Sequence, residues 1–312
     1  VDVSDPANPQ RITTFATPSN FAHNCWLSND GRTLFTTDER PYGEVAAFAV
    51  HDLDNVEQVG RYQKDPGTGM IPHNVFYKNG YLITSYYRQG VTLTDAHRPG
   101  NLVEVGWYDT SPIGPGPGFE GCWGVYPFLP SGKLLATDRQ MGLFVLRPQF
   151  TRACYIEGVV TDEQGVPYPN TRVSVEGGTF TYTDIAGRFK LGTAEPGRYD
   201  VEAFRADCQG QRQSVVVARD SISTLTFTLN CSFTTTPRPA PSTTKVWWAN
   251  GQLYWQPTAA LQLSVFNVQG QQIWSDRVKN PGQLSTRNWS SGLYSVRWYA
   301  EGAWQTFQWV QP

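Results

Sequence analysis

The 312-residue chain lacks the features that would assign it to a membrane, nucleic-acid or common enzyme class. It has no run of 18 apolar residues, so we expect no transmembrane helix. Charged residues are 17% of the chain and the formal net charge is −2, which argues against nucleic-acid binding because that needs a basic patch. The sequence also contains no G-x-S-x-G elbow, H-E-x-x-H helix or phosphate-cradling glycine loop. No short motif therefore indicates a catalytic mechanism.

Cysteine is scarce, with five residues, and the number is odd. If the protein is exported, we expect thiols to pair and one thiol to stay free. No signal peptide is visible, and we expect the chain to begin inside a repeat, with earlier repeats preceding Val1.

Aromatic residues and turn-forming residues are abundant. Aromatic residues make up 13% of the chain, with 11 Trp, and there are 29 Gly and 22 Pro. This composition favours short strands joined by many turns.

Residues 1–148 repeat one pattern three times. In each copy a turn dipeptide ending in glycine precedes an apolar strand, at residues 30–38, 79–86 and 131–138. A second short strand precedes each of these and opens on a shared signature: HNCW at 23–26, HNVF at 73–76 and EGCW at 120–123. A period of about 45 to 50 residues built only from strands is typical of β-propeller blades. Because a propeller ring normally takes about four to eight blades, we expect three blades of an incomplete ring.

The rest of the sequence predicts two small β-sandwiches and a linker. About seven short alternating strands are expected in residues 152–231. Residues 232–245 are rich in Pro and Thr and predict an extended linker. Residues 246–312 return to alternating strands. The predicted fold class is all-β, with a partial β-propeller in residues 1–150 followed by the two sandwiches.

All three regions resemble known families. Residues 1–148 resemble the choice-of-anchor B family of bacterial surface propellers with LVIVD-type repeats. The motifs that carry this resemblance are VDVSDPANP at 1–9, HN at 73–74, LVEVGWY at 102–108, WGVYP at 123–127 and GLFVLRP at 142–148. Residues 154–231 resemble a carboxypeptidase regulatory-like domain through GVVTD at 158–162, TDIAG at 183–187 and PGRY at 196–199. That resemblance implies an accessory sandwich with no chemistry of its own.

Residues 246–312 resemble the C-terminal sorting domain of type IX secretion in Bacteroidota. The matching residues are LSVFNVQGQ at 263–271, Ile273 and SSGLYSV at 290–296. The resemblance implies export across the outer membrane, the type IX machinery as a partner, and an extracellular or cell-surface location.

The repeated signature also predicts where a site would lie. In an antiparallel pair the start of one strand lies beside the end of the next, and the strand starts of successive blades face the same rim of the channel. We therefore expect six candidate ligands to gather at that rim: His23, His73, Asp38, Glu39, Glu120 and Asp138. Tyr86, Tyr87 and Arg88 are expected beside them. Two imidazoles and several carboxylates can bind a divalent metal or support acid/base chemistry, and no other cofactor is indicated.

A purely structural interpretation of the same signature stays open. Asn24 and Asn74 can cap strand ends, and a buried histidine commonly bonds a backbone carbonyl. Trp26, Phe76 and Trp123 occupy equivalent positions and are expected to pack between blades.

Cys154, Cys208 and Cys231 flank or lie within the middle sandwich, and one disulfide is expected among them. Of the three pairings, Cys208–Cys231 is favoured because Cys208 begins the loop that leads towards the final strand. Cys25 and Cys122 are expected to be packed thiols, too far apart across the ring to form a bridge.

The sequence predicts a non-enzymatic surface or matrix protein that binds a surface polymer or protein. The alternative is a secreted metal-dependent hydrolase or lyase that uses the channel rim. A third possibility is self-assembly into filaments, since strand edges of the sandwiches can pair with other strands.

Overall fold

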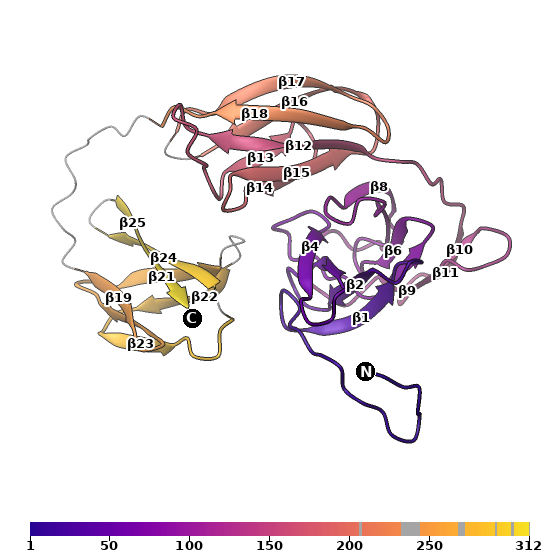
Figure 1. The fold of residues 1–312 in the computed structure, drawn as a ribbon, viewed down its shortest axis with the longest axis horizontal. Coiled ribbons are helices and arrows are strands. Elements are labelled where there is room, and N and C mark those ends of the chain that lie inside the picture. Colours follow the sequence, from indigo (N-terminus) through magenta and orange to yellow (C-terminus); the bar gives the residue numbers. More distant parts are fainter. Residues whose placement is uncertain (206–207, 232–243, 268–271, 291, 301–302, 312) are drawn as a thin grey trace.

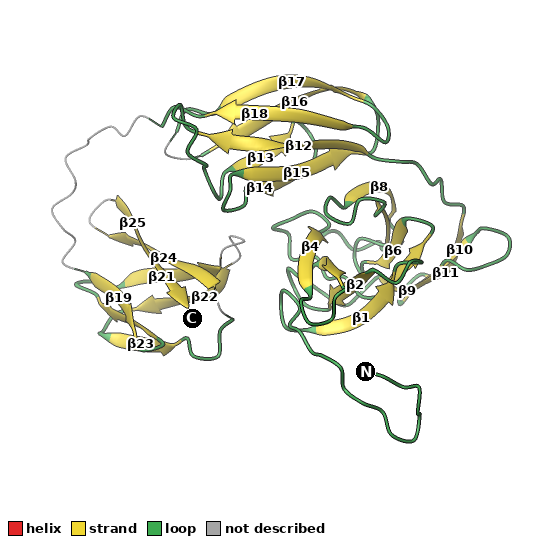
Figure 2. Ribbon diagram, viewed as in Figure 1, coloured by secondary structure: helices red, strands yellow, loops and turns green. Residues whose placement is uncertain are grey.

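The computed structural model describes residues 1–205, 208–231, 244–267, 272–290, 292–300 and 303–311. Strands and turns form all of the regular structure in these ranges, and no helix occurs in them (Figure 2). The described residues thus offer no helix that could cross a membrane. The all-β prediction is confirmed.

Three antiparallel sheets follow one another along the first half of the chain (Figure 1). The first holds β1 (Ala22–Leu27), β2 (Thr33–Asp38), β3 (Val45–Ala49) and β4 (Glu57–Tyr62). The second holds β5 (Val75–Lys78), β6 (Tyr81–Ser85), β7 (Val91–Asp95) and β8 (Val103–Tyr108). The third has three strands, β9 (Cys122–Tyr126), β10 (Leu134–Asp138) and β11 (Gly142–Leu146). Each sheet is a meander in which neighbours in sequence pair in space.

The turn between β5 and β6 shows why these hairpins form where the sequence predicts them. Asn79 and Gly80 have φ values of 49° and 85°. Two successive positive φ values define the type I′ turn, whose twist matches that of a hairpin and which favours Asn-Gly. A Cβ on Gly80 would also lie 2.1 Å from the His97 ring, so the position has no room for a side chain.

The second sheet is covered on both faces by its neighbours. On one face Leu82 of β6 packs against Phe35 and Val45 of the first sheet. On the other face Ile83 packs in a cluster with Val125 of the third sheet. Because successive side chains of a strand point to opposite faces, every residue of β6 is buried. The first three sheets therefore pack one upon the next in chain order.

The third sheet leaves its outer face open. Leu143 and Val145 are 62% and 57% exposed. Trp26 and Phe76 meet across the first two sheets, as the repeat predicts, with ring centroids 4.9 Å apart. Trp123 contacts the ring of His73, which precedes β5, at a centroid distance of 5.2 Å, while 54% of its surface stays exposed.

Residues 154–228 form two packed sheets around one hydrophobic core. One sheet has the order β15 (Arg188–Thr193), β12 (Cys154–Thr161), β18 (Ile222–Thr228), and β12 and β18 run parallel. The other has the order β14 (Phe180–Tyr182), β13 (Arg172–Val175), β16 (Gly197–Phe204), β17 (Gln211–Val217). Gly158 allows β12 and β18 to approach, because a Cβ there would lie 1.9 Å from the Leu225 carbonyl oxygen.

A buried ionic joint connects this sandwich to the second sheet. The Asp95 carboxylate at the end of β7 is fully buried and accepts hydrogen bonds from the Ala153 N–H at 2.7 Å and from Arg152 Nε at 3.3 Å. Tyr155 of β12 is buried in the same hydrophobic cluster as the second and third sheets. The start of the sandwich is thus packed into the preceding sheets.

The last described region also consists of two sheets around one core. One contains β19 (Lys245–Ala249), β20 (Gln252–Gln256) and β23 (Gly282–Ser285). The other contains β22 (Gln272–Val278), β21 (Leu261–Asn267), β24 (Gly292–Ala300) and β25 (Ala303–Gln311). Leu261, Leu263 and Val265 point into the core, as their alternation predicts. Most of the predicted linker, residues 232–243, lies outside the described residues.

Candidate functional site

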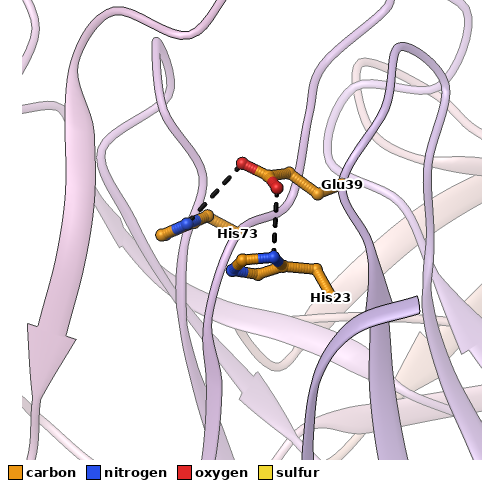
Figure 3. A group of neighbouring side chains, drawn as sticks. All are labelled: His23, Glu39 and His73. Carbon is orange, nitrogen blue, oxygen red and sulfur yellow. Dashed lines mark ion pairs between the residues drawn. The ribbon is translucent and has the colours of Figure 1, made fainter. Parts of the chain in front are cut away.

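Three of the six predicted rim residues come together at one edge of the first two sheets (Figure 3). His23 lies near the start of β1, Glu39 directly follows β2, and His73 lies two residues before β5. One potential ligand atom from each lies within 4.8 Å of the other two. The antiparallel pairing of β1 with β2 brings His23 to Glu39, and the packing of the second sheet on the first adds His73.

His73 is held rigidly. Its side chain is 3% exposed, and its Nδ1 donates a hydrogen bond to the Trp123 carbonyl oxygen. Its backbone carbonyl accepts a hydrogen bond from the Thr37 hydroxyl at 2.6 Å. Burial lowers the pKa of the His73 imidazole and outweighs the opposing effects of the Trp123 carbonyl and the Glu39 carboxylate. Nδ1 is thus the donor to the Trp123 carbonyl, and Nε2 faces Glu39 Oε1 at 3.6 Å.

Glu39 is oriented from two sides. Its Oε2 lies 3.1 Å from His23 Nδ1, and its Oε1 accepts a hydrogen bond from the Tyr87 hydroxyl. Burial, followed by the hydrogen bond to Glu39, raises the pKa of Tyr87 far above its ordinary value, so Tyr87 stays a donor. The carboxylate therefore has a fixed orientation between the two imidazoles.

The two imidazole rings stack on one another. Their centroids are 4.4 Å apart and their planes are inclined by 24°. His23 is the open side of the cluster, with a side chain that is 33% exposed, whereas the Glu39 side chain is 17% exposed. Solvent and small ions can thus reach the cluster past His23.

Asn24, the second residue of the repeated signature, joins the two sheets beside the cluster. Its Oδ1 accepts a hydrogen bond from the Val75 N–H of β5 at 2.9 Å. In the first copy of the repeated signature, the candidate ligand His23 is thus followed directly by Asn24, whose hydrogen bond holds the two sheets together.

The other three predicted residues lie outside the cluster and have partners of their own. The Asp38 carboxylate is fully buried and accepts hydrogen bonds from the Thr17 hydroxyl and the Ser19 N–H, both at 2.5 Å. Asp138 accepts from the Thr110 hydroxyl at 2.8 Å. These two carboxylates hold loops against strand ends.

Glu120 occupies the position of the signature that His23 and His73 hold in the earlier copies. Its carboxylate pairs with the Arg88 guanidinium, with Nη2 2.7 Å from Oε2, and that hydrogen bond lowers the pKa of Glu120. Glu120 is thus turned towards Arg88 and is absent from the cluster.

The structure pairs Cys208 with Cys231 and leaves Cys154 as a buried thiol. Cys25 is an exposed thiol and Cys122 a buried one. No thiol belongs to the cluster of His23, Glu39 and His73.

Of the two groups that orient the cluster, the sequence placed Tyr87 at the rim but did not indicate its hydrogen bond to Glu39. The Trp123 carbonyl was not predicted as a partner, because no pattern in the chain marks a backbone carbonyl.

Two imidazoles and one carboxylate can bind a divalent transition metal through nitrogen and oxygen. Without a metal, the same groups can exchange a proton between His23 and Glu39.

A depression of about 400 Å³ on the surface is lined by Trp123, Thr137, Asp138 and Arg139.

Comparison with protein families identifies the middle region. Residues 155–230 match the carboxypeptidase regulatory-like domain, which confirms the prediction for residues 154–231. The match covers the sandwich and leaves the two flanking regions unassigned. No curated protein matches the chain.

Three solved structures illustrate what the chain is similar to. A candidate carbohydrate-binding protein from Bacteroides uniformis has 13% identity and a TM-score of 0.26, covering 50% of this chain and 98% of that one. The Bacillus anthracis TIE protein has 11% identity and a TM-score of 0.23, covering 93% of this chain and 54% of that one. A streptococcal ancillary pilin has 8% identity and a TM-score of 0.24, covering 86% and 78%. Similarity at this level supports no argument about function.

Proposed function

We propose that the chain is part of an exported cell-surface protein that binds an extracellular polymer or protein without catalysing a reaction. Residues 1–150 are C-terminal blades of a β-propeller of the choice-of-anchor B type. Residues 152–231 are the accessory sandwich, residues 232–245 a linker, and residues 246–312 the sorting domain recognised by the type IX secretion machinery. The mature protein resides at the outer surface of a Bacteroidota cell.

The observation that carries the propeller proposal is the ordered packing of the first three sheets. Each sheet is an antiparallel meander, and the second packs on the first through Leu82 and on the third through Ile83. Propeller blades pack in this way, face to face in chain order. The apolar outer face of the third sheet, with Leu143 and Val145 exposed, suits contact with a further blade.

Export is tested in a Bacteroidota cell with an intact type IX system. The chain is placed behind a general secretion signal peptide, and intact cells are treated with a protease that does not enter them. We expect digestion of the full chain at the surface. We expect protection when residues 246–312 are deleted or when the secretion system is inactivated. Surface digestion that survives both changes would contradict the proposed route.

The retention of the sorting region separates a matrix-assembly role from a simple binding role. Intact-mass measurement of protein released from the surface determines whether residues 246–312 persist. A retained region, together with concentration-dependent association in sedimentation, would support self-assembly through exposed strand edges.

The cluster of His23, Glu39 and His73 is the specific observation that favours a second function, a metal-dependent hydrolase or lyase. Three protein ligands would leave a coordination position for water, as in catalytic zinc sites. Incubation of the metal-loaded chain with extracellular polysaccharides and proteins decides between the two functions. Turnover that disappears in Glu39→Gln would replace the binding proposal with the enzymatic one.

A further inference from the structure

We propose that His23, Glu39 and His73 bind one divalent transition-metal ion between the first two sheets. The distances suit such an ion. His23 Nδ1 lies 3.1 Å from Glu39 Oε2, and His73 Nε2 lies 3.6 Å from Glu39 Oε1. Two ligands that are each about 2.1 Å from a tetrahedral ion lie about 3.4 Å apart. These two separations involve different oxygens of Glu39. The single ligand atoms that the three residues offer lie within 4.8 Å of one another, so binding requires the side chains to close by up to about 1.4 Å.

The hydrogen bonds around His73 leave one ring nitrogen for an ion. Nδ1 donates to the Trp123 carbonyl, so Nε2 is the ring atom that can ligate a cation. Nε2 faces Glu39 Oε1 at a distance of 3.6 Å, so one ion placed between them can contact both residues.

The surrounding groups orient the ligands as partners of metal ligands do. A metal-bound histidine commonly donates its other N–H to a carbonyl or carboxylate, and ligating carboxylates are themselves hydrogen-bonded. Here the Trp123 carbonyl fixes His73, and the Tyr87 hydroxyl fixes Glu39. Both partners are in place before an ion arrives, so little ordering is needed on binding.

The ligand set determines the class of ion. Two imidazole nitrogens and one carboxylate suit Zn²⁺ and its neighbours in the first transition row. Ca²⁺ is disfavoured because it takes at least about six oxygen ligands, and Mg²⁺ because it retains water and prefers oxygen. The open side past His23 leaves space for a water molecule or a ligand group on the ion.

The proposed ion would join two sheets. His23 lies in β1 and Glu39 directly follows β2 of the first sheet, whereas His73 precedes the first strand of the second. An ion that binds only when these segments are packed stabilises the folded state in proportion to the logarithm of its concentration. Metal binding should therefore raise the unfolding temperature as well as occupy the site.

Zinc titration of the purified full chain tests the proposal directly. The protein is prepared without a polyhistidine tag, treated with a chelator, and titrated with Zn²⁺ in a calorimeter. We expect one ion per chain, and an affinity at least tenfold lower in His23→Ala and in Glu39→Gln. His51→Ala removes an exposed histidine outside the cluster and should bind like the parent. Equal binding in all four proteins, or no stoichiometric binding, would overturn the proposal.

His73 is buried, so a variant at this position could lose the fold along with the ligand. Tyr87→Phe avoids that problem, because it removes the hydrogen bond to Glu39 while keeping the ring. We expect about a tenfold loss of zinc affinity with unchanged far-ultraviolet circular dichroism. Co²⁺ provides a second signal through its visible absorption bands, which should appear in the parent and vanish in Glu39→Gln. Parent-like zinc affinity in Tyr87→Phe would refute the orienting role of Tyr87, and missing Co²⁺ bands in the parent would refute the metal site.

Discussion

Asp95 allows the joint between the second sheet and the middle sandwich to be tested quantitatively. Its side chain is fully buried and accepts hydrogen bonds from the Ala153 N–H at 2.7 Å, the His97 N–H at 3.0 Å and the His97 ring at 2.8 Å. It also pairs with Arg152 at 3.3 Å. Replacement by alanine would leave buried donors without an acceptor.

The expected cost of Asp95→Ala is about 3 kcal/mol in the free energy of unfolding. Removing one partner of a buried, hydrogen-bonded ion pair costs about 3–5 kcal/mol. We expect the lower end because the Arg152 side chain is 30% exposed and regains contact with water. Asp95→Asn retains one acceptor oxygen and should cost about half as much.

Asp220→Asn is the matched control. Asp220 pairs with the same arginine, with Nη2 2.5 Å from Oδ1, but its side chain is 53% exposed. Asparagine removes the charge and tolerates the φ of 58° at this position, whereas alanine would add backbone strain. Exposed pairs contribute about 0–1 kcal/mol. The three variants are compared by urea denaturation of the full chain, followed by circular dichroism. If Asp95→Ala costs no more than Asp220→Asn, the reasoning about the buried joint is refuted.

Three further outcomes follow from single features. Burial raises the pKa of the Asp95 carboxyl, but hydrogen bonds from Ala153 and His97 outweigh it, so the pKa lies below its usual value. The contribution of Asp95 to the free energy of unfolding should then be complete at neutral pH and be lost below about pH 4. The free energy of unfolding of the parent and of Asp95→Asn, measured across this pH range, should therefore differ at neutral pH and converge in acid. Reduction of the Cys208–Cys231 disulfide, whose cysteines lie 23 residues apart, should lower the free energy of unfolding by about 3 kcal/mol. Thermal unfolding with and without reductant measures this change, and an unchanged transition temperature would contradict a native bridge. Gly158→Ala should cost about 2 kcal/mol or more, measured by urea denaturation, because its Cβ would press on a β18 carbonyl.

Local sequence signals were sufficient to predict the hairpins and the approach of the two histidines. Asn79-Gly80 specifies a type I′ turn by its own conformational preferences. The shared signature places His23 and His73 at equivalent strand starts, and packing of successive sheets then brings their rings to 4.4 Å. Such inferences need only periodicity and strand polarity.

The choice among neighbouring acidic residues could not be predicted in the same way. Asp38 and Glu39 are adjacent, yet Asp38 turns to Thr17 while Glu39 turns to His23. Glu120 has the position of a histidine in the repeat, but Arg88 draws it away. These outcomes depend on loops and side chains far along the chain, which a repeat pattern does not describe.

The most direct test of the proposed metal site is anomalous diffraction at the zinc absorption edge from crystals of the zinc-saturated chain. The account predicts one strong peak bonded to His23, Glu39 and His73, with Tyr87 still hydrogen-bonded to Glu39. A saturated protein with no peak at that position, or with its zinc held by other side chains, would contradict it.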